Sequence, residues 1–104
     1  MATPVTITID EAGINADPPT VKIKKGARHE KITWTIATSG WKFTRDGIVI
    51  HGNFNQFTGR GSDHRREFHW NSRNSNTNRY EYTINVTNGT TTATRDPGIK
   101  NGGQ

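Results

Sequence analysis

The stretch of residues 18–36 constrains the fold most, because its apolar residues follow a strict two-residue period. From residue 20 to 24 valine and isoleucine alternate with lysine, and from 32 to 36 isoleucine and tryptophan alternate with threonine. Successive side chains of a strand point to opposite faces, so each run has one apolar face. The pattern predicts two strands paired as a hairpin, with Lys25-Gly26-Ala27-Arg28 at its tip and Trp34 at the centre of the core.

Similar short runs recur along the rest of the chain. They cover residues 5–9, 41–44, 48–50, 68–70, 80–86 and 90–95. Asp46-Gly47 and Asn88-Gly89 stand between such runs and are typical of hairpin turns, since they supply the positive φ that tight turns need. No segment has a useful helical period. About seven or eight strands at short spacing predict an all-β fold, a Greek-key β-sandwich.

The composition favours one folded domain over residues 1–104. The hydrophobic fraction is only 29%, but the periodic placement of the apolar residues argues against disorder. The chain has no cysteine, which excludes disulfides and thiolate metal ligands. After Asp96-Pro97-Gly98 we expect residues 99–104 to be a flexible tail, and we expect a monomer.

The hydropathy pattern gives no membrane span, because no apolar run approaches the roughly 18 residues that a spanning helix needs. The first residues also lack the features of a signal peptide. We therefore expect a cytoplasmic protein or, if a leader has been removed, a periplasmic or secreted one.

Two segments look irregular. Residues 51–66 contain three glycines and few apolar groups, and a loop of this length on a rigid sandwich often carries recognition. Residues 71–78 (NSRNSNTN) are polar and of low complexity, so we expect an exposed loop there.

Basic residues in two loops suggest one alternative function. Arg60, Arg65 and Arg66 lie in the glycine-rich part of residues 51–66, where backbone N–H groups and guanidinium groups can bind anions. A second basic segment contains Lys22, Lys24, Lys25, Arg28 and Lys31. With a net charge of +5, the two segments could form one surface for a polyanion or nucleic acid.

Histidines suggest another alternative, a copper or zinc site without cysteine. The candidates are His51, His64 and His69, with Asp63 beside His64. Their spacings match no known ligand motif, and alternation places His69 on the solvent face, opposite Phe68 and Trp70. We therefore expect no metal and no other cofactor.

Several of these segments resemble cupredoxins. Residues 18–26 contain a proline, an alternating strand and a Lys25-Gly26 turn, residues 32–35 form a strand with a central aromatic, and residues 80–86 are similar to a strand near a cupredoxin C-terminus. Immunoglobulin-like sandwiches share much of this pattern, and the 41–50 and 96–101 segments resemble small bacterial proteins of the cupredoxin kind. The resemblance implies that fold, but a type 1 copper centre needs a cysteine thiolate and two histidines, and the chain has no cysteine.

No catalytic motif accounts for the remaining polar residues. Ser62-Asp63-His64 contains the residue types of a hydrolase triad, but triad members are brought together by the fold and no nucleophile-elbow sequence is present. The sequence therefore predicts a non-catalytic binding or accessory module, with a protein or a polyanion as its partner.

Overall fold

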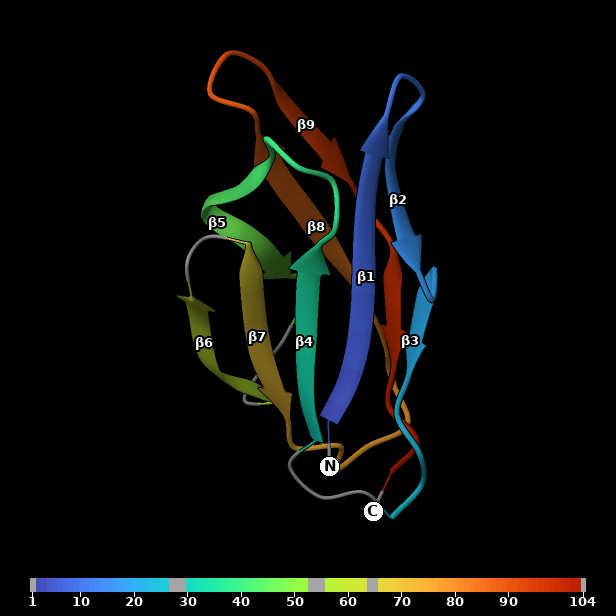
Figure 1. The fold of residues 1–104 in the computed structure, drawn as a ribbon. Helices are drawn as coiled ribbons and strands as arrows, with labels where there is room; N and C mark the ends of the chain where they lie inside the picture. Colours follow the sequence, from blue (N-terminus) through green and yellow to red (C-terminus); the bar gives the residue numbers. More distant parts are fainter. Residues whose placement is uncertain (1, 27–29, 53–55, 64–65, 104) are drawn as a thin grey trace.

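Ten strands in two sheets make up the fold, and no described residue lies in a helix (Figure 1). The computed structural model describes residues 2–26, 30–52, 56–63 and 66–103, with residues 2 and 58–63 described by their backbone alone. The strands are β1 (Ala2–Asp10), β2 (Gly13–Asp17), β3 (Thr20–Lys22), β4 (Glu30–Ile36), β5 (Lys42–Ile50), β6 (Phe57–Asp63), β7 (Glu67–Ser72), β8 (Arg79–Thr87), β9 (Thr92–Arg95) and β10 (Gly98–Lys100).

The two sheets face each other as the layers of a β-sandwich (Figure 1). The first sheet has the order β2-β1-β4-β7-β6, and the second has the order β3-β10-β8-β5 with β9 also paired to β8. Both sheets are mixed, because β1 pairs with β4 and β3 pairs with β10 in parallel. The predicted all-β sandwich is confirmed. The strand count exceeds the predicted seven or eight. β2, β6 and β10 lie where no strand was expected, whereas the expected runs 41–44 and 48–50 both belong to β5.

The predicted hairpin over residues 18–36 is wrong. β3 lies in the second sheet beside β10, whereas β4 lies in the first sheet between β1 and β7. Val21 and Trp34 are both fully buried in the same core, so the two strands bury their apolar faces from different sheets instead of lying side by side. Alternation has the same period in paired strands and in strands that face each other from two sheets. It could not distinguish these arrangements.

The predicted turn at Asp46-Gly47 is also wrong, because β5 runs through it. The pairing of β5 with β8 shifts register between Phe43 and Ile48, where four residues of β5 stand against one residue of β8. Gly47 is needed there, since a Cβ would lie 2.6 Å from the Cβ of Phe43. The hairpin at Asn88-Gly89 is confirmed between β8 and β9, and the Asn88 side-chain oxygen accepts hydrogen bonds from the next backbone N–H groups.

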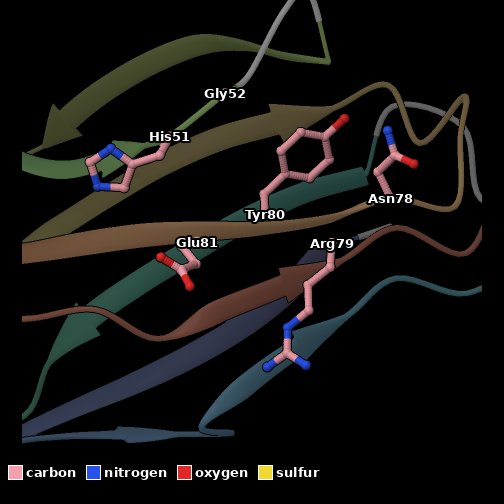
Figure 2. A pocket seen from close by; sticks show the side chains of 6 residues that line it. All are labelled: His51, Gly52, Asn78, Arg79, Tyr80 and Glu81. Atoms are coloured by element: carbon pink, nitrogen blue, oxygen red, sulfur yellow. The ribbon is translucent and has the colours of Figure 1, made fainter.

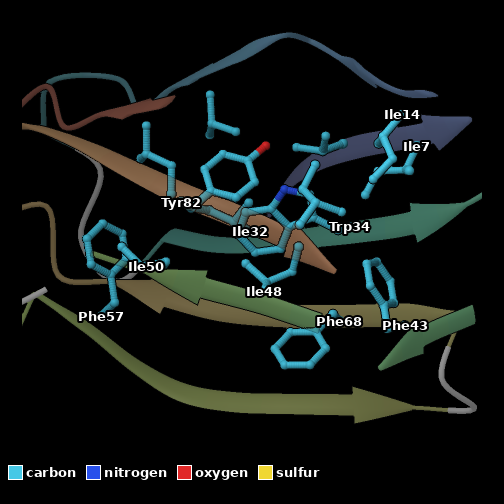
Figure 3. Close-up of a cluster of buried hydrophobic side chains, with 14 of the residues drawn as sticks. Ile7, Ile14, Ile32, Trp34, Phe43, Ile48, Ile50, Phe57, Phe68 and Tyr82 are labelled. Carbon is cyan, nitrogen blue, oxygen red and sulfur yellow. The ribbon is translucent and has the colours of Figure 1, made fainter. Parts of the chain in front are cut away.

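The core lies between the sheets, and both sheets contribute aromatic rings to it (Figure 3). Trp34 is fully buried, as predicted from the alternation of residues 32–36. Its ring lies against Tyr82 of the second sheet, with centroids 5.2 Å apart. Phe43 and Phe68 make a second contact between sheets, edge to face at 5.7 Å. Such offset aromatic pairs stabilise beyond their burial alone.

Two polar atoms in this core lack a hydrogen-bond partner within the described residues, Trp34 Nε1 and the Tyr82 hydroxyl. Burial raises the pKa of Tyr82 to about 12. The nearby indole N–H of Trp34 and the charge of Arg95 oppose this effect only partly. Burial of the Tyr82 hydroxyl therefore costs folding free energy, because a desolvated donor without a partner loses the hydrogen bonds that it makes to water.

Replacing Tyr82 by phenylalanine is accordingly expected to leave the free energy of unfolding within about 0.5 kcal/mol of the parent protein, or to raise it. The two proteins should diverge in alkali. A phenol whose pKa is 10.0 when unfolded and about 12 when folded contributes stability below pH 10 that is lost as the pH rises towards 12. Urea unfolding at pH 7 and pH 11 measures both effects. A loss above 1 kcal/mol at pH 7 would show that the hydroxyl has a partner.

Residues 51–66 are more regular than predicted, because β6 forms along β7 within them. The predicted tail is wrong as far as residue 103. Ile99 is fully buried in β10, which pairs with β3 and β8. Gly102 packs so closely that a Cβ would lie 2.2 Å from the carbonyl oxygen of Ile23. The C-terminal residues therefore belong to the folded domain.

The expectation of an exposed loop over residues 71–78 is wrong in part: residues 73, 75, 77 and 78 are exposed, but Ser72 and Asn74 are fully buried. The Asn74 amide donates to the carbonyls of Lys24 (2.9 Å) and Gly103 (3.1 Å). Its oxygen accepts from the N–H groups of Gly102 (2.8 Å) and Gly103 (3.0 Å). We call these contacts the Asn74 network; it joins the 71–78 loop, the end of the chain and the segment after β3.

Candidate anion-binding face

Three cationic side chains lie in register on the outer face of the second sheet. Lys100 of β10 is paired with Lys22 of β3 on one side and with Arg79 of β8 on the other. Their neighbours Val21, Ile99 and Tyr80 are buried, whereas all three cations are exposed. We call Lys22, Lys100 and Arg79 the cationic row. With strands about 4.8 Å apart, the row spans roughly 10 Å.

Glu81 of β8 lies next to Arg79 on the same face, but in the described structure it forms no ion pair with the row. Within the part of the chain that the structure describes, Lys22, Lys100 and Arg79 make no side-chain hydrogen bond and no ion pair. Arg79 instead lies across Gly98, where a Cβ would be 3.3 Å from its Nε and Nη2 atoms. The missing side chain of Gly98 thus leaves room for the guanidinium group to lie flat on the sheet, with its donors available to a ligand.

A shallow, open hollow of about 510 Å³ adjoins the Arg79 end of the row. Its lining comes from the end of β5 and the start of β8 (Figure 2) and consists of His51, Gly52, Asn78, Arg79, Tyr80 and Glu81. The Tyr80 ring belongs to the core and its hydroxyl accepts a hydrogen bond from Asn76. The hollow therefore offers a cation, a carboxylate, an amide and an imidazole.

The imidazole in this hollow is held by a chain of two hydrogen bonds. His51 Nε2 lies 2.7 Å from the Thr83 hydroxyl, and that hydroxyl donates to Asp96 over 2.6 Å. Because Thr83 has one proton and gives it to Asp96, His51 Nε2 must be the donor to Thr83. In the neutral ring Nδ1 is then the free acceptor, so the fold fixes both the ring and its tautomer.

The structure does not bring the predicted basic residues onto one surface. Lys24 and Lys25 are exposed and directly follow the Lys22 end of the row. Arg66 lies beside the last residue of β4, where its guanidinium donates to the Ile36 carbonyl. The length of β4 places this point about 20 Å from the first residue of the strand. Arg28 and Arg65 lie outside the described residues, and Arg60 is described by its backbone alone. Of the predicted basic residues whose side chains are described, Arg66 thus lies apart from Lys24 and Lys25.

The two histidine candidates that the structure describes lie on different sheets. His51 lies on the outer face of the second sheet. His69 is half-buried on the outer face of the first sheet, because its neighbour Phe68 points into the core. His64 lies outside the described residues. Among the residues that are described, no group of three His, Cys, Asp or Glu side chains could hold a metal ion.

Comparison with known proteins adds no assignment: no protein-family model matches this chain, and a search of curated proteins gives no match. Among the described residues the structure contains no helix long and apolar enough to cross a membrane.

Proposed function

We propose that this protein is a small, non-catalytic binding module that takes an anionic ligand on the cationic row. The observation that supports this proposal is that Lys22, Lys100 and Arg79 lie in register on three neighbouring strands. Like charges directly opposite each other destabilise a sheet, so the row has no structural benefit among the described residues. A local cost in stability without a structural gain is typical of a functional surface.

The proposal includes a cupredoxin-like sandwich without a type 1 copper centre. Its support is that the segments of the resemblance lie in β3, β4 and β8, at the middle or edge of two facing sheets. A type 1 centre requires a cysteine thiolate, which this sequence does not contain. The Greek-key connection of the strands is part of the same proposal.

Anion binding is tested by NMR titration with a heparin-derived tetrasaccharide at low and at moderate salt. We expect shifts at Lys22, Arg79, Gly98 and Lys100 that weaken steeply with salt, because phosphate- or sulfate-type contacts release counterions. Lys100→Gln should weaken binding severalfold and lower the slope of log affinity against log salt by about one.

Lys31→Gln is the matched control, because Lys31 is exposed on the other sheet. It changes the net charge equally but lies outside the row, so its effect should be small. Equal weakening by the two variants would mean that binding follows net charge alone, and the cationic row would then not be a site.

The stability cost of the row gives a separate prediction. Lys100→Glu places a carboxylate between Lys22 and Arg79 and is expected to raise the free energy of unfolding by about 0.5–1 kcal/mol at low salt. The gain should shrink as salt screens these exposed charges. Urea unfolding measures it, with Lys31→Glu as the control. If Lys31→Glu raised the free energy of unfolding as much as Lys100→Glu, the like charges of the row would not be locally destabilising.

A further inference from the structure

A second hollow, of about 440 Å³, lies at the other end of the cationic row. It is lined by Thr3, Pro18, Pro19, Thr20 and Lys22. Two proline rings give it an apolar wall. The Thr3 hydroxyl already donates to the buried Glu30 carboxylate over 2.5 Å, so it adds no free donor. Lys22 belongs both to this hollow and to the row, and the row therefore runs from an apolar hollow to a polar one.

We propose that the ligand of this face is an acidic peptide segment of a partner protein, with an aliphatic side chain beside its carboxylates. The inference rests on the proposed function and specifies its ligand. The carboxylates lie along the cationic row, where Arg79 presents a planar pair of donors. The aliphatic side chain enters the proline-lined hollow at Lys22, which removes apolar surface from water.

The dimensions of the face suit a short extended peptide. The row spans roughly 10 Å from Lys22 to Arg79, and an extended chain advances about 3.3 Å per residue. About three residues therefore cover the row. A peptide with carboxylates at alternate or successive positions and one aliphatic residue beside them can therefore contact the cationic row and the apolar hollow at the same time.

Other polyanions match this face less well. Single-stranded nucleic acid binds through bases stacked on exposed aromatic rings, but the outward residues of β3, β8 and β10 in the described structure include no aromatic side chain. Tyr80 and Tyr82 point into the core. Membrane surfaces are bound by apolar groups that protrude and insert, whereas this face has a hollow that receives a group from its partner.

The test uses two heptapeptides of equal charge, one with a central leucine between three glutamates on each side and one with serine in place of leucine. Isothermal titration with the full chain should give about fivefold tighter binding of the leucine peptide, as burial of part of a leucine side chain predicts. Thr20→Trp fills the hollow and should abolish this preference while leaving the serine peptide unaffected. Thr94→Trp on β9 is the control and should preserve the preference.

The outcomes separate the two proposals. Equal affinity for both peptides, or a heparin tetrasaccharide that binds more tightly than the leucine peptide, overturns the acidic-peptide inference and leaves anion binding intact. Failure of every anion to bind in a salt-dependent, Lys100-dependent way overturns the proposed function itself. Preference for the leucine peptide that survives Thr20→Trp shows that the leucine binds elsewhere, and this too overturns the inference.

Discussion

Asn74→Ala is expected to lower the free energy of unfolding by about 3–5 kcal/mol. The Asn74 side chain is fully buried and makes four hydrogen bonds to backbone groups of Lys24, Gly102 and Gly103. Alanine would leave these groups without their partner, and each buried polar group without a partner costs about 1–3 kcal/mol. Asn74 also has a φ of 53°, a region that asparagine tolerates better than alanine.

Urea unfolding followed by circular dichroism measures this loss, and Asn88→Ala is its matched control. Asn88 also accepts hydrogen bonds from two backbone N–H groups, Thr90 and Thr91, but in an exposed hairpin where water can replace it. Its replacement should cost about 0.5–1 kcal/mol. If both variants lost the same stability, burial of Asn74 would have no energetic consequence and the network would not hold the end of the chain.

Alternation in the sequence predicted the strands well, because burial on one face of a strand leaves a local pattern. Trp34, with its neighbours at residues 32 and 36, was placed correctly in the core for this reason. The partners of a strand leave no such pattern. Residues 20–24 and 32–36 alternate identically whether they pair as a hairpin or belong to different sheets around one core, and the structure has the second arrangement.

Buried polar segments were predicted least well. Residues 71–78 have the composition of an exposed loop, yet Ser72 and Asn74 are buried because distant residues satisfy their side chains. The Ser72 hydroxyl donates to the side-chain oxygen of Asn101, and the Asn74 side chain bonds to backbone groups of two other segments. Such long-range hydrogen bonds have no local signature. The prediction at Asp46-Gly47 was wrong for a different reason, since the glycine is required by contact with the Phe43 side chain four residues earlier rather than by a turn between two strands.

The candidate site could be predicted only in part. Lys22 and Lys24 were recognised from the basic segment, and the alternation of residues 80–86, extended by one residue, would have placed Arg79 on the outer face. Lys100 was missed because residues 99–104 were taken as a tail. Only the parallel pairing of β10 with β3 puts Lys100 between Lys22 and Arg79, and that pairing joins residues far apart in the sequence.

Trp34→Ala is the second change with a large expected effect, a loss of about 3–5 kcal/mol in the free energy of unfolding. Trp34 is the largest fully buried side chain and contacts Tyr82 across the sheets. Its removal deletes apolar burial, leaves a cavity between the two layers and breaks the aromatic pair. The loss in the free energy of unfolding is slightly smaller than it would otherwise be, because the variant no longer buries an indole N–H without a hydrogen-bond partner.

Trp41→Ala serves as the comparison, because Trp41 is only partly buried at the margin of the core. We expect it to cost about 1–2 kcal/mol, in proportion to the smaller apolar area that it removes from water. Circular dichroism follows both unfolding transitions without depending on tryptophan emission. A loss for Trp34→Ala no larger than that for Trp41→Ala would mean that the two sheets do not pack around Trp34.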